Sequence, residues 1–587
     1  MQRFVQELKD RRIWRVLVAY PSVAFVLLEA IEFFVSNYGL DERSLTVGLL
    51  LAIGLFPAAV VWNWRHGEEG QQAFSRTEVG SYVVFGVAAV AAAGWYLKNS
   101  PAPSDVYSGA DAPVTSIVVL PFENASGNED LTYLTQGISE NLINWLASLP
   151  GIRVVSKSAA FRYSGDAFEN EALVREFGAD SVIRGSLGTR SDQLVISASF
   201  TRLADDSQLW GERLVRPLDE VIFLERSIVS AIKDSLSIKL NDGQGRSAAS
   251  GSTDSPEAYR RFLRGHHLIQ ATDIESLNQG LEELREAIRL DPKFGLPYAD
   301  IADALSQMVF YGLLEDPALI GEARNAAYSA VALAPDLPEA HTALATMHQY
   351  LTFDWPAVEQ AYETAIALSP QLPAPYHRYA DYLWVTLRFN KAREMAKRAI
   401  EIDPLDSSSM HAVGLIELFS GNFEKAAQAL GDWNRFHPQS RWSYVKHAVA
   451  LSLAGRCDES GKQLAKVEQL TGGQMSSLMS SWVGWSHEIC GREDLYLNMK
   501  ENIVAAQRQR PDRIDPALIW FYMTEGEVEK AVDLMQSMVE EKHPATLFIQ
   551  VYMLDIMRTP KFGGVQNDPR YLRLIADLKF PPADHNR

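Results

Sequence analysis

The sequence predicts a multi-domain α+β protein that combines three transmembrane helices, a small α/β domain and an all-α solenoid of helical repeats. Three observations lead to this prediction. Three apolar segments crowd residues 1–100, strand-like and helix-like segments alternate over residues 116–240, and prolines recur every 34 residues within 256–587. Two polar stretches rich in Pro, Gly, Ser and Asp, 101–115 and 241–255, are expected to be linkers.

The first 100 residues are expected to be a membrane anchor. Its apolar segments run over about 13–35, 45–64 and 79–97, and the second and third contain no charged residue. Each has the ~20 residues that a helix needs to cross a hydrocarbon core of ~30 Å. Three transmembrane helices are therefore predicted, with an interfacial or re-entrant helix as the alternative for the first segment.

Basic residues predict the orientation of the anchor, because Lys and Arg favour the cytoplasmic side of a membrane. The N-terminal tail and the loop between the second and third segments hold seven of them: Arg3, Lys9, Arg11, Arg12, Arg15, Arg65 and Arg76. The opposite side has Arg43 and Lys98. The sequence thus predicts an inner (cytoplasmic) membrane protein with a cytoplasmic N-terminus and periplasmic C-terminal domains.

Two acidic residues interrupt the first apolar segment. Glu29 and Glu32 are three apart and share one helix face. A charge inside a span is costly and usually faces a partner or water, so an intramembrane contact is one interpretation. The other is that both carboxylates lie near the outer headgroups and are solvated.

Composition argues against nucleic acid as a partner. The net charge is -19, and residues 1–100 are neutral, so the acidic excess lies beyond them. Sequence-independent phosphate binding needs Lys and Arg to displace counterions. The two cysteines, Cys457 and Cys490, match no zinc spacing. They are either unpaired or joined in one disulfide, which would indicate an oxidising compartment.

Residues 116–240 alternate between strand and helix signals. β-branched apolar runs predict strands, helical spacing of Leu and Ile predicts helices, and Pro150-Gly151 ends the first helix. The domain should be a small α/β fold with an antiparallel portion. The expected strands are 116–122, 152–155, 181–190, 193–203 and 208–215, and the expected helices are 131–149, 171–177 and 221–240.

This stretch resembles the TolB amino-terminal-like domain. The matching segments are Ser116–Gly127, Gln136–Leu142, Arg153–Ser156, Gly185–Leu187 and Leu209–Arg213. The anchor is also similar to that of membrane proteins in which this domain precedes repeats, at Phe4–Arg12 and Gly54–Pro57. The resemblance implies an envelope interaction module without catalytic residues. Relatives with this layout are often labelled adenylate cyclase-like because some fuse a cyclase domain, and this chain shows neither that domain nor a winged-helix one.

The spacing of prolines predicts helical repeats in the C-terminal part of the chain. Pro370, Pro404 and Pro438 are 34 residues apart, and Pro292 and Pro335 extend the series with wider intervals. A 34-residue period in which Pro closes the second helix is the tetratricopeptide signature. About seven or eight helix pairs are expected, followed by a terminal helix. Stacked pairs bury one another's apolar faces and form a solenoid with a concave groove.

By position in the tetratricopeptide unit, five first-helix residues are expected to face that groove and to bind a peptide or a partner helix. The alternative is that these side chains only pack within the array. The five are His377, Asp381, Trp384, His411 and Leu415.

Catalytic motifs are not found. The sequence contains no G-x-S-x-G, P-loop, G-x-G-x-x-G or H-E-x-x-H pattern, and the pair His266-His267 has no third ligand nearby in sequence. No catalytic residue, cofactor or metal site is predicted, and the chain is not expected to be an enzyme. An unrecognised envelope hydrolase is the weakest alternative.

These patterns lead to two hypotheses about the function. The first is a membrane-anchored periplasmic scaffold or adaptor that binds protein partners of the envelope through the repeats and the TolB-like domain, with homo-oligomerisation compatible with either surface. The alternative is a transmembrane signalling component of the adenylate cyclase-like group that acts through a separate cytoplasmic partner.

Overall fold

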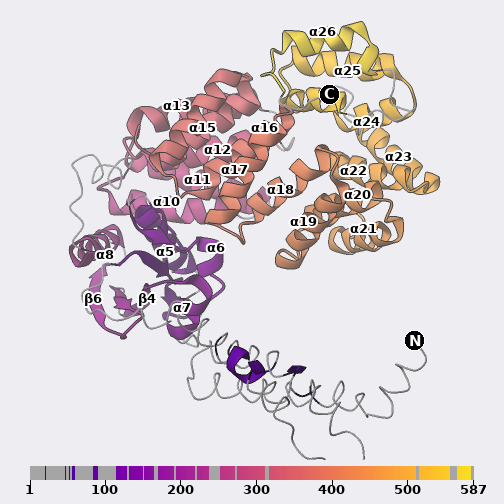
Figure 1. The fold of residues 1–587 in the computed structure, drawn as a ribbon. Helices are drawn as coiled ribbons and strands as arrows, with labels where there is room; N and C mark the ends of the chain where they lie inside the picture. The colour runs from indigo at the N-terminus through magenta and orange to yellow at the C-terminus, as the bar shows by residue number, and fades with distance from the viewer. Residues whose placement is uncertain are drawn as a thin grey trace, which may run out of the picture. The chain divides into compact units, whose positions relative to one another are not determined.

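The computed structural model describes residues 114–583 with short gaps, and before them residues 20, 47, 52, 56–57, 59, 84–89 and 91. The gaps are 129–130, 148, 150, 164–169, 191–192, 218–220, 237–251, 271–273, 311–315, 510–513 and 555–564. Contacts divide the chain into two compact units, Met1–Ala112 and Pro113–Arg587 (Figure 1).

The first unit contains the expected anchor. The hydroxyl of Tyr20 donates a hydrogen bond to the Ala52 carbonyl oxygen (2.7 Å), and its ring lies 5.2 Å from that of Phe56. Most of the three expected spans, together with Glu29 and Glu32, lie outside the described residues. Within the part of the chain that the structure describes, no helix combines the length and apolar character that a membrane crossing requires.

The second unit begins with a mixed sheet of six strands, which confirms the predicted α/β region and adds β2 to the five strands that the sequence predicts. Its main strand order is β3-β1-β4-β5-β6, and β2 pairs with β4. β1 is parallel to β3 and β4, whereas β4, β5 and β6 form an antiparallel meander. The strands are β1 Ser116–Val119, β2 Glu123–Asn124, β3 Arg153–Val154, β4 Ser181–Arg190, β5 Gln193–Arg202 and β6 Gln208–Pro217.

Helices cover both faces of this sheet because side chains alternate along each strand. Ile117 and Val119 of β1 belong to the core under α5 (Thr132–Ala147) and α8 (Val221–Leu236). Val118 belongs to a separate core under α6 (Lys157–Ala160) and α7 (Asn170–Phe177). Strand β1 is buried and uncharged because helices pack on both faces of the sheet at this strand.

Eight consecutive helix pairs follow within the described residues, and they confirm the predicted helical repeat region (Figure 1). They are α10 Pro256–Ile269 with α11 Ile274–Leu290, α12 Gly295–Phe310 with α13 Pro317–Leu333, α14 Pro338–Met347 with α15 Trp355–Leu368, α16 Pro373–Val385 with α17 Phe389–Ile402, α18 Ser407–Phe419 with α19 Phe423–Phe436, α20 Arg441–Leu453 with α21 Cys457–Thr471, α22 Ser477–Ile489 with α23 Glu493–Gln509, and α24 Ala517–Thr524 with α25 Val528–Glu540. The segments η4 His348–Thr352, η5 Pro544–Met553, η7 Val565–Asn567 and α26 Pro569–Asp577 complete the unit.

The turn inside most pairs uses one left-handed residue. Gly421, Gly455, Gly491 and Gly526 have φ between 66° and 84° at this point. In the two preceding pairs the same turn holds Phe353 (φ 55°) and Leu387 (φ 60°). A side chain there costs roughly 1–2 kcal/mol relative to glycine, so these two pairs depend more on packing around the turn. Tyr362 lies on α15, the helix that directly follows Phe353. It is buried, and its ring stacks on that of Tyr379 with centroids 5.4 Å apart.

The α/β region packs against the array. Helix α5 contacts α10, and the Asn141 side-chain amide donates to the Tyr259 hydroxyl (2.6 Å). Further along, the Gln371 amide donates to the Ile152 carbonyl oxygen (2.9 Å). At the other end of the array, η5 contacts α12, η4 and α16, so the C-terminal segment returns to the middle repeats.

Candidate functional site

The first helices of successive pairs form a row. Helices α12, α14, α16 and α18 contact one another in order, as do α20, α22 and α24. All five predicted groove residues lie on this row, three on α16 and two on α18. The row is therefore the surface on which a tetratricopeptide-type array would bind a partner.

The structure buries three of the five predicted groove residues. Trp384 and Leu415 are each 4% exposed and His377 is 8% exposed, whereas Asp381 and His411 are half-buried. Trp384 stacks on Phe419 with ring centroids 4.6 Å apart. The aromatic contacts continue from Phe419 through α22 into α24. Packing within the array thus accounts for much of the apolar part of the predicted set.

His411 and a lysine that the sequence did not single out form one cluster. Lys446 on α20 contacts Nε2 of His411, and its Nζ lies 5.5–5.9 Å from the ring centroids of Trp433, Trp442 and Trp482. Burial lowers the pKa of Lys446 to about 8. Burial, and then the positive charge of Lys446, lower the pKa of His411 well below its usual value. The imidazole is therefore neutral at pH 7.

One acidic residue near this cluster, Asp381, lies on α16, and another, Asp406, caps the start of α18. Burial raises the pKa of Asp381, although His377, Arg378 and Lys446 oppose that shift. The indole Nε1 of Trp384 donates to an oxygen of Asp381 at 3.3 Å. His377 Nδ1 lies 3.4 Å from Asp406 Oδ2. This stretch of the row therefore presents half-buried charges beside aromatic rings.

A second cluster lies where the α/β region meets the array. His266 Nδ1 is 2.7 Å from Asp300 Oδ2, and its Nε2 is 3.7 Å from Glu140 Oε1 of α5. Burial alone would lower the pKa of His266, but Asp300 and Glu140 raise it well above the usual value. Glu140 also pairs with Lys157 (2.6 Å), and these partners overcome burial to hold its pKa at about 2. His266 is therefore a cation that bridges carboxylates of both regions.

Sequence reasoning missed Lys446 and Asp300, and a signal for both existed. Asp300 follows His266 by 34 residues, and Lys446 follows His411 by 35. Residues one repeat apart on first helices become neighbours when the pairs stack. Searching for charged residues one repeat apart would therefore have found both contacts. His266 of the His266-His267 pair meets Asp300 through the stacking of repeats and Glu140 through the packing of α5 against the array.

The two cysteines form a disulfide between the start of α21 and the residue after α22. The structure thus decides between the two alternatives that the sequence left open. Over the residues that the structure describes, no group of three or more His, Cys, Asp or Glu side chains is arranged to hold a metal ion.

No protein-family model matches the chain. A 231-residue segment is 26% identical to a protein of Rhizobium meliloti (strain 1021) described as "Putative adenylate cyclase 3". The match covers 39% of this chain and 39% of that protein, so the chain spans about two fifths of the curated relative that it matches.

Several solved structures are similar to parts of the chain. A tetratricopeptide repeat protein from Parabacteroides merdae is 13% identical, covers 42% of this chain and 93% of its own, and has a TM-score of 0.31. The type IV pilus biogenesis factor PilW is 16% identical, with 36% and 94% covered and a TM-score of 0.30. The repeat architecture rests on the helix pairs described above, which define a tetratricopeptide-like class of helical repeat fold.

Proposed function

We propose that the protein is a membrane-anchored scaffold of the cell envelope whose repeats bind protein partners on the periplasmic side. The observation that carries this proposal is the row of first helices, where Asp381, His411 and Lys446 stay half-buried beside aromatic rings. Interfaces take most of their affinity from a few such anchors, particularly aromatic ones. The proposal includes no catalytic role, no cofactor and no nucleic acid.

The periplasmic location is supported by the disulfide between Cys457 and Cys490. Disulfides persist in oxidising compartments and are rare in the cytosol. The seven basic residues on the expected cytoplasmic side of the anchor support the same orientation. Alkylating free thiols in intact cells before lysis tests this location. Both cysteines should resist alkylation until a reductant is added, and free thiols in freshly trapped cells would contradict the proposal.

The α/β region enters the proposal as a TolB-like interaction module. Support comes from the resemblance of residues 116–240 and from a fold in which a parallel pair precedes an antiparallel meander. Its docking on α10 through Asn141 and Tyr259 makes it part of the same scaffold. It would hold a second envelope partner or mediate self-association.

Crosslinking in intact membranes tests the scaffold proposal. The full-length chain is purified after crosslinking, and the crosslinked peptides are identified by mass spectrometry. The proposal expects crosslinks from another envelope protein that concentrate on the first helices of the array. A purified chain without crosslinks to any other protein would contradict it.

A second candidate is a signalling component of the cyclase-like group, favoured by the relative described as a cyclase. In that case the anchor would relay periplasmic binding to a separate cytoplasmic protein. Measuring cyclic-nucleotide formation by the purified chain, with and without cytoplasmic extract, separates the two. Activity of the purified chain would overturn the scaffold proposal. Activity that appears only with extract would favour the signalling role.

A further inference from the structure

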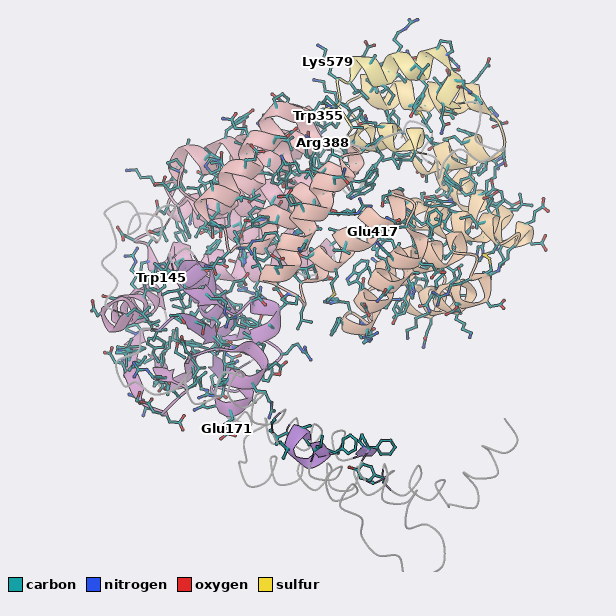
Figure 2. The ribbon with its side chains drawn as sticks, viewed as in Figure 1. Trp145, Glu171, Trp355, Arg388, Glu417 and Lys579 are labelled. Carbon is teal, nitrogen blue, oxygen red and sulfur yellow. A yellow bond between two sulfur atoms is a disulfide. The ribbon has the colours of Figure 1, made fainter. Side chains whose placement is uncertain are left out.

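The residues after α26 lie against the start of α15. The indole Nε1 of Trp355 donates to the Leu578 carbonyl oxygen at 2.8 Å, across 223 residues of sequence. The ring of Phe580 stacks on the Trp355 indole with centroids 5.0 Å apart and planes 20° apart. Figure 2 shows Trp355 and Lys579 close together at this point. The tail therefore contacts the array through one backbone carbonyl and one aromatic ring.

Beside these contacts a hollow of about 780 Å³ remains between α15 and the tail. One wall is the outer side of α15, including Trp355, Glu359 and Glu363, and the other is the tail segment Lys579–Pro582. Trp355 is 3% exposed, whereas Phe580 is half-buried and Lys579 is exposed. The tail covers the indole but does not fill the space around it.

The sequence of the tail has the chemistry of a recognition peptide. Lys579 and Phe580 precede Pro581 and Pro582. Consecutive prolines prefer the polyproline II conformation, which leaves backbone carbonyls free and costs little entropy on binding. Aromatic-lined grooves bind such segments, and a buried indole N–H usually donates a hydrogen bond to a partner such as a backbone carbonyl oxygen. Glu359 and Glu363, which pair with Arg388 and Lys391, also line the hollow and give its α15 wall a polar edge.

We propose that the surface of α15 around Trp355 binds a segment of a partner protein in which a basic and an aromatic residue precede prolines. The segment Lys579–Pro582 occupies this surface in the free chain as an intramolecular ligand. A partner segment replaces the tail, forms the same hydrogen bond to Trp355 and extends into the hollow. This inference rests on the proposed scaffold function and adds a binding surface separate from the row of first helices.

The test measures binding of a fluorescent peptide with the sequence of Asp577–Ala583 to the full-length protein by fluorescence anisotropy. F580A removes the ring that covers Trp355, so this variant should bind the peptide at least about tenfold more tightly than the unchanged chain. Adding W355L to F580A should abolish that gain. Adding W442L instead should preserve it, because Trp442 lies in the Lys446 cluster.

Equal peptide affinities of F580A and the unchanged chain, with identical circular dichroism, would overturn the proposal. Concentration-dependent dimers of the unchanged chain that W355L abolishes would also overturn it, because the occupant would then be the tail of a second copy. If F580A fails to fold, excess peptide is added to the unchanged chain. Limited proteolysis should then cut the tail faster, and an unchanged cleavage rate counts against the proposal. Crosslinks on the first helices do not depend on Trp355, so the scaffold proposal is tested separately.

Discussion

Two histidines on first helices of the same array differ in charge: His266 is a cation and His411 is neutral. His266 on α10 faces the carboxylates of Asp300 and Glu140, and its pKa is raised. His411 on α18 faces Lys446, and its pKa is lowered. Burial disfavours the charged form at both positions. Because burial acts in the same direction at both histidines, their charged neighbours account for the difference between them.

The largest expected effect comes from removing the acid beside His266. Asp300→Ala leaves a half-buried imidazolium with one carboxylate fewer, which should cost about 2 kcal/mol, between the values for exposed and fully buried pairs. Urea unfolding at pH 6 measures the change. The matched control is Leu495→Ala on α23, where the side chain is 46% exposed and the change should stay within about 0.5 kcal/mol. If both substitutions lowered the free energy of unfolding equally, the Asp300–His266 pair would stabilise the fold no more than an ordinary surface side chain does.

The pH dependence of stability should have opposite signs at the two histidines. Because the folded pKa of His266 is raised, its contribution is full below about pH 6.5 and is lost as the pH rises through the folded value. Because the folded pKa of His411 is lowered, its contribution is full above about pH 6.5 and is lost as the pH falls towards the folded value.

Matched substitutions measure this difference. H266Q should cost more stability at pH 5.5 than at pH 8.5, and H411Q should cost more at pH 8.5 than at pH 5.5, by about 1 kcal/mol in each case. Unfolding curves at the two pH values give both numbers. If both variants lost more stability at the same one of these pH values, the two histidines would not differ as described.

The smallest effect is expected at Lys446. K446M removes the cation beside His411 and keeps most of the side-chain volume among the three Trp rings. Replacing a buried charge with an apolar group of similar volume is often neutral, so stability should change by less than about 1 kcal/mol. The pKa of His411 should rise, as followed by nuclear magnetic resonance of its ring. An unchanged pKa would mean that burial alone lowers it.

The sequence predicted the architecture of the described part more completely than the site. β-branched runs located β1, β4, β5 and β6, and the spacing of Pro370, Pro404 and Pro438 located the central helix pairs, because both signals are local. The burial of Trp384 depends on Phe419 and on Phe548 of η5, and Trp355 depends on a carbonyl 223 residues away. No local pattern carries such contacts, so the apolar groove residues and the tail contact emerge only from tertiary packing.

The most direct test asks which face of the array meets a partner in cells. A photoreactive benzoylphenylalanine is placed at Trp442, beside Lys446 on the row of first helices, or at Lys397 on the second helix α17, where the side chain is 78% exposed. Illumination of intact cells should give a discrete adduct with another envelope protein from position 442 and little or none from position 397. Adducts of equal yield from both positions, or none from position 442, would contradict the account.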